Sequence, residues 1–104
     1  MTHVKLTKGF IVSGAADLDA HTDVVMDQLV ALEDERISDA DVSVDFSKDS
    51  VEISVVAHAD SFDEAVEQAD AAIRTAIHAA GGSTAGWTRV KFTPQTSNAD
   101  LVHA

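Results

Sequence analysis

The sequence of 104 residues contains no cysteine, no tyrosine, one proline and one tryptophan. Without cysteine the chain cannot form disulfides, iron–sulfur clusters, CxxC redox centres or thiolate zinc sites. No apolar run approaches the roughly 18–20 residues of a membrane span, and the segment MTHVKLTKGF lacks the apolar core of a signal peptide. We therefore expect a cytoplasmic protein that does not associate with membranes.

Basic residues are also scarce. Seven lysines and arginines face 18 aspartates and glutamates, which gives a net charge of −11. Such a balance opposes nucleic-acid binding, because that requires cations that neutralise phosphates. The acids concentrate in residues 17–52, which hold twelve acids and two bases. We expect no nucleic-acid partner.

The clearest structural signal is the stretch from Ser61 to Gly82. Apolar residues recur there three or four positions apart, as on one face of a helix. Ser61 followed by Glu64 forms a capping box at its start, and Gly81 with Gly82 predicts its end. A second amphipathic pattern predicts a helix from about Leu18 to Glu35.

Alternating apolar and polar residues predict four strands. They cover residues 5–13, 42–46, 51–58 and 87–93. Pro94 is expected to end the last strand. The sequence thus predicts one domain over residues 1–93 and a flexible tail over 94–104.

The order strand, helix, strand, strand, helix, strand resembles that of ferredoxin-like domains. The resemblance lies in element order alone, over residues 5–93, and involves no sequence motif. It implies an α+β sandwich in which a four-stranded antiparallel sheet, ordered 4-1-3-2, carries both helices on one face.

The central hairpin has a predicted register. A four-residue loop over Ser47–Ser50 pairs Phe46 with Val51, and it makes the buried face wholly apolar. The same register sets Asp45 opposite Glu52 on the outer face, where two like charges repel each other.

An uncovered sheet face is the candidate interaction surface. Its predicted members form a basic and aromatic edge, a mildly apolar middle and an acidic edge: Trp87, Arg89, Lys91, Ile11, Val56, Asp45 and Glu52. A two-fold dimer would place the basic edge of one copy on the acidic edge of the other. For Trp87 the alternative role is to cover a helix end or the rim of the sheet.

Three aspartates at four-residue spacing, Asp19, Asp23 and Asp27, form an acidic strip on the first helix. The strip is either a solvated face that keeps the protein soluble or a docking site for a basic partner.

Motifs for catalysis or metal binding are few. RNA-recognition domains of this shape stack bases on aromatic residues of the central strands, where this chain has Ile11, Ser54 and Val56. His58 and Asp60 could bind a metal or act as a base, but no HxxxH or HExxH spacing is present. We assign no catalytic residue, metal ligand or cofactor.

The sequence therefore favours a non-enzymatic interaction or assembly module. It would associate with itself through the open sheet face or serve as a subunit of a larger protein complex. Two alternatives remain open: a dimeric domain that binds or converts a small molecule, and an acidic regulator that docks a basic protein.

Overall fold

A computed structural model describes residues 2–14, 18–83 and 91–102. Its elements are β1 (Thr2–Ser13), α1 (Leu18–Ala31), β2 (Ile37–Asp45), β3 (Ser50–Ala59), α2 (Phe62–Ser83) and β4 (Lys91–Leu101). The strands form one sheet in the order β2-β3-β1-β4, which is 4-1-3-2 when it is read from the β4 edge. All neighbouring strands run antiparallel. The predicted α+β architecture with two helices is confirmed.

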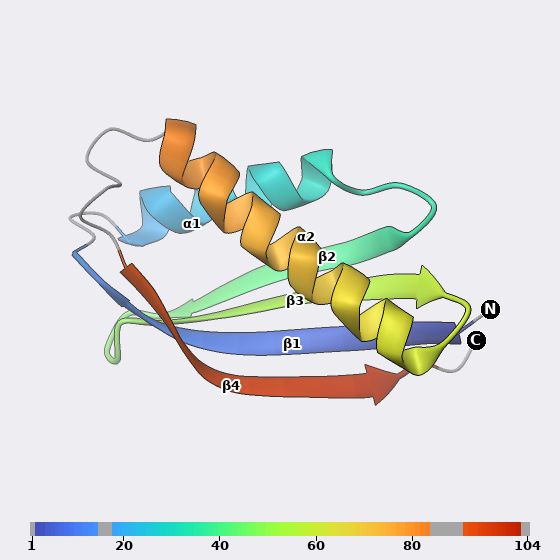
Figure 1. Ribbon diagram of the computed structural model, residues 1–104. Coiled ribbons are helices and arrows are strands. Elements are labelled where there is room, and N and C mark those ends of the chain that lie inside the picture. Colours follow the sequence, from blue (N-terminus) through green and yellow to red (C-terminus); the bar gives the residue numbers. More distant parts are fainter. Residues whose placement is uncertain (1, 15–17, 84–90, 103–104) are drawn as a thin grey trace.

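Both helices lie on the same face of the sheet (Figure 1). The core lies between these layers and takes alternate residues of the strands, including Val4, Leu6, Val51, Ile53 and Val55. The helices add Val25, Leu29, Ile73 and a series of buried alanines at positions 65, 69, 72, 76 and 80. Because alanine is small, it lets α2 lie close to the strands that it crosses.

The predicted cap of α2 is present. The Glu64 amide donates a hydrogen bond to Ser61 Oγ at 3.2 Å, so one amide of the first turn has a partner. The helix extends one residue beyond the predicted stretch, through Gly81 and Gly82 to Ser83. Neither glycine adopts a positive φ, so neither forms the left-handed cap that the pair suggested.

The α1 helix ends at Ala31, not near Glu35. Asp34 explains the early end, because its Oδ1 accepts hydrogen bonds from the amides of Arg36 at 2.7 Å and Ile37 at 3.1 Å. These bonds hold the pKa of Asp34 below its ordinary value, and the Arg36 amide has the larger effect. An aspartate that binds amides two and three residues ahead favours a turn over a helix.

β2 consequently starts at Ile37, five residues before the predicted start at Val42. The added segment contains a bulge, since Ser38 pairs with Val56 but Asp41 pairs with Ser54. Asp39, with φ at 50°, lies inside this bulge. Alternation is lost at such a bulge, and this explains why the sequence pattern revealed only the later half of the strand.

The hairpin register was wrong by two residues. Val44 pairs with Val51 and Asp45 pairs with Ser50, so the loop is 46–49. Asp45 Oδ1 accepts hydrogen bonds from Ser47 Oγ at 2.6 Å and from the Ser47 amide at 3.0 Å. This turn takes Phe46 out of the strand and leaves it 61% exposed.

The extent of β4 also differs from the prediction. Residues 94–101, expected to be a flexible tail, belong to the edge strand that pairs with β1. Pro94 lies opposite Phe10, at a register shift between Gly9 and Phe10. A proline is tolerated there because an edge strand bonds on one side only and a bulge interrupts the pairing.

We expect Gly9→Ala to lower the free energy of unfolding by about 1 kcal/mol, because the added methyl overpacks the contact with β4. A Cβ built on Gly9 would lie 2.5 Å from Thr96 Oγ1. The loss should shrink in a Thr96→Ala background, and urea denaturation of the four proteins measures this coupling. Equal losses in both backgrounds would show that Thr96 is not the cause.

Candidate functional site

The sheet face opposite the helices is polar. The registers place on it Ser38, Asp41, Ser43, Asp45, Glu52, Ser54, Val56, His58, His3, Lys5, Thr7, Gly9, Ile11, Thr93, Thr96, Asn98 and Asp100. Most of these side chains are hydroxyls, amides or acids. The face therefore offers many hydrogen-bonding groups and little apolar area.

The predicted interface residues differ in their solvent exposure. Ile11 is on this face and is 38% exposed, whereas Val56 is only 6% exposed and offers little contact area. Lys91 starts β4 opposite Ser13. Trp87 and Arg89 lie outside the described residues.

Asp45 and Glu52 do not face each other, because Asp45 pairs with Ser50 and Glu52 pairs with Ser43. The predicted repulsive pair is therefore wrong. Both carboxylates nevertheless border one hollow of about 360 Å³, which Lys48 also lines. The Ser47 hydroxyl holds the pKa of Asp45 below its ordinary value, so this acid is ionised near neutral pH.

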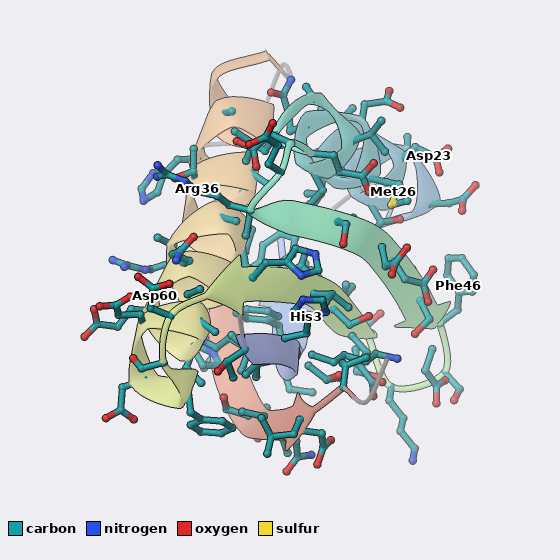
Figure 2. All side chains as sticks on the ribbon, turned by 90° about the vertical axis from the view of Figure 1, so that its right-hand side faces the viewer. His3, Asp23, Met26, Arg36, Phe46 and Asp60 are labelled. Carbon is teal, nitrogen blue, oxygen red and sulfur yellow. The ribbon has the colours of Figure 1, made fainter. Side chains whose placement is uncertain are left out.

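The acidic strip is exposed on α1, as its four-residue spacing predicts for one helix face: Asp19, Asp23 and Asp27 are all solvent-accessible. Figure 2 shows Asp23 and Met26 on the side of the molecule that also carries Phe46, and Arg36 and Asp60 on the opposite side. Because α1 packs beside β2, the strip adds to the acids of β2 and makes this side of the protein strongly negative.

One charged cluster was not predicted from the sequence. Lys8 occupies a core-facing position of β1, and its Nζ lies 2.6 Å from Asp70 Oδ1 on α2. Arg74 Nε contacts the other oxygen of Asp70 at 3.0 Å. The Lys8 hydrogen bond lowers the pKa of Asp70. A signal was present in the sequence, since Lys8 interrupts the alternating series Leu6, Lys8, Phe10.

His58, a candidate from the sequence, has two polar or aromatic neighbours. His3 lies directly opposite it across β1 and β3, with ring centroids 4.3 Å apart and planes at 85°. Ser38 Oγ lies 2.9 Å from His58 Nε2. The contacts of His58 with His3 and Ser38 could not be predicted from the sequence, because Ser38 was expected to lie outside any strand. Within the described residues, no group of three or more acidic or histidine side chains forms a metal site.

The two edges of the sheet differ in charge. β2 carries Asp39, Asp41 and Asp45 together with a bulge, and natural edge strands use such features to prevent pairing with other chains. In β4 the stretch 95–99 has neither charge nor proline, and Asp100 is the only charged residue from Phe92 to Leu101. β4 has a proline and a bulge of its own over residues 94–96, but from Phe92 to Leu101 it carries one acid against the three of β2, so the β4 edge is the less charged one.

The helices carry no candidate membrane span: across the described ranges 2–14, 18–83 and 91–102, none is both long and apolar enough. Comparison with known proteins gave no match to a family model, to a curated protein or to a solved structure.

Proposed function

We propose that this protein is an assembly module that associates with a second copy of itself by pairing their β4 edges. One observation carries the proposal: beyond the bulge at residues 94–96, β4 presents an uncharged edge over residues 96–99, while β2 carries three aspartates. Antiparallel addition of a strand to a sheet edge satisfies the outward backbone amides and carbonyls.

Charge favours the β4 edge over the β2 edge. Antiparallel pairing of two β4 strands about Ser97 sets Thr96 opposite Asn98 and Pro94 opposite Asp100, so no like charges meet. Pairing of two β2 strands about any residue from 40 to 43 sets one aspartate opposite another. A β4 pair also places the acidic α1 and β2 of each copy at the far ends of the joined sheet, which reduces repulsion between two chains of net charge −11.

The fold supports this role. We infer a ferredoxin-like arrangement from the element order, the antiparallel sheet and the placement of both helices on one face. In that arrangement the β4 edge borders the uncovered face. Pairing would therefore join two such faces into one continuous polar surface.

The test replaces Thr96 and Asn98 with lysine in one variant. Both side chains are exposed, and pairing about Ser97 would bring each lysine opposite a lysine of the other copy. We expect a dimer in the wild type and a monomer in this variant, measured by light scattering after size exclusion. The control Ser43→Lys/Thr75→Lys adds the same charge at exposed positions of β2 and α2, and it should stay dimeric.

The salt dependence of the dimer affinity distinguishes edge pairing from a dimer that is held together by opposite charges. Screening weakens repulsion between two acidic chains, so edge pairing should tighten as salt rises. A dimer that joins basic and acidic edges across the sheet face would loosen instead. A wild-type monomer at every concentration and salt level, or a dimer in the Thr96→Lys/Asn98→Lys variant, would refute the proposal.

A further inference from the structure

The end of the sheet near Ala59 holds a pair of imidazoles, one of which has a polar neighbour in Ser38. His3 and His58 are cross-strand partners on the uncovered face, where opposed Cβ atoms lie about 4.5–5.5 Å apart. Their ring centroids are 4.3 Å apart. Figure 2, which views the molecule from this end, shows His3 away from α2, while Arg36 and Asp60 lie beside that helix. The rings are half-buried and remain open to solvent.

Both histidines are fixed by backbone bonds on their outer flanks. The His58 amide donates a hydrogen bond to the Arg36 carbonyl at 2.8 Å, and the Val102 amide donates one to the His3 carbonyl at 2.8 Å. Each residue is also paired with the other across β1 and β3. The two rings thus project from a part of the sheet that is held on both sides, so little ordering is needed to bring their nitrogens together.

Ser38 supplies the second feature of a metal site. Its Oγ lies 2.9 Å from His58 Nε2, and a neutral imidazole that donates from Nε2 has a free lone pair on Nδ1. Histidines that bind metals almost always use their other ring nitrogen in such a bond, which fixes the tautomer and the ring orientation. A rotation of the His3 side chain would be required to present one of its nitrogens to the same point.

We propose that His3 and His58 form a two-imidazole site for a late first-row divalent cation, with Ser38 orienting His58. Imidazole pairs suit copper, nickel and zinc, whereas magnesium and calcium prefer oxygen ligands. Two protein ligands leave the other coordination positions of zinc to water. The two ligands lie on β1 and β3 and the orienting hydroxyl on β2, so the site does not use the outward edge of β4.

Isothermal titration of the full chain with zinc tests the site. Variants His3→Gln and His58→Gln each remove one ligand, and His78→Gln is the matched control because His78 is an exposed histidine on α2. We expect one zinc per chain in the wild type and in the control. Each ligand variant should bind at least roughly tenfold more weakly, and Ser38→Ala should weaken binding about tenfold. Magnesium should give no heat of binding.

A rescue variant separates loss of a ligand from loss of the fold. His3→Cys replaces one zinc ligand with another in a chain that has no cysteine of its own, so it should recover zinc binding that His3→Gln lacks. Zinc should also raise the melting temperature of the wild type and of His3→Cys, since a ligand of the folded state stabilises it. No binding by the wild type, unchanged affinity in His3→Gln, or equal weakening by His78→Gln would overturn the proposal.

Discussion

Ile73→Ala is expected to lower the free energy of unfolding by about 3–4 kcal/mol, the largest effect of any single substitution considered. Ile73 has no solvent exposure and is one of the largest fully buried side chains. The cost of such a truncation combines the lost transfer free energy with the cavity that remains. Its neighbours along the buried face of α2, Ala69, Ala72 and Ala76, are too small to fill that cavity.

The matched control for Ile73→Ala lies two residues further along the same helix. Thr75 is exposed, and Thr75→Ala should change stability by less than about 0.7 kcal/mol, and toward higher stability, because alanine is the better helix former. Urea denaturation followed by circular dichroism measures both variants. A loss below about 1.5 kcal/mol for Ile73→Ala would mean that α2 can move toward the sheet and collapse the cavity.

Asp70→Ala should cost about 2 kcal/mol, because it leaves the ammonium group of Lys8 without its acid. The Lys8 side chain is only 16% exposed, and its Nζ lies 2.6 Å from Asp70 Oδ1. Removing one partner of a fully buried ion pair costs about 3–5 kcal/mol. We reduce that figure because the Asp70 side chain is 32% exposed and because water screens such pairs.

Lys8→Met should be much milder, within about 1 kcal/mol of the wild type. It removes the charge that needs compensation and replaces the stem with an apolar chain of similar length. Asp70 keeps its contact with Arg74. The double variant Lys8→Met/Asp70→Ala should therefore be more stable than Asp70→Ala alone. Equal stability of the two would show that the Lys8 ammonium group is already hydrated when Asp70 is absent.

The pH dependence follows from the same pair. The Lys8 hydrogen bond lowers the pKa of Asp70 below 3.8 in the folded protein. The unfolded chain therefore binds a proton more readily than the folded one, so stability rises with pH in this range. The contribution is fully present above the unfolded pKa near 4, and it is lost as the pH falls through the lower folded value. Lys8→Met should flatten that part of the stability curve.

The sequence predicted best where local and tertiary requirements agree. In α2 the periodic apolar residues, the Ser61 cap and the acidic first turn all favour a helix, and a helix is present. The number, type and order of the elements followed from the same kind of agreement. Within the described residues, the strand positions predicted to face the core do so, because alternation survives a register shift of two residues; Phe46, which lies in the hairpin loop, is the exception.

Boundaries and register failed where one side-chain hydrogen bond decides the backbone path. Asp34 ends α1 and Asp45 sets the hairpin turn by accepting hydrogen bonds from amides just ahead of them. Apolar pairing alone could not choose the hairpin register, since Val44 meets an apolar partner in Val51 as well as in the predicted Ile53. The prediction for the polar stretch 95–101 was wrong for another reason. An edge strand buries few side chains, so its sequence carries almost no hydrophobic pattern.

By itself, the sequence determined the α+β class, the two helices, the excess of acid on α1 and β2, and the absence of thiol chemistry. These properties depend on composition and on local periodicity. Only the tertiary structure decided that Lys8 meets Asp70, that His3 and His58 lie side by side near Ser38, and that β4 forms an edge of the sheet. Each of these joins residues distant in the chain, and strand pairing, with its bulges and shifts, sets which of them meet.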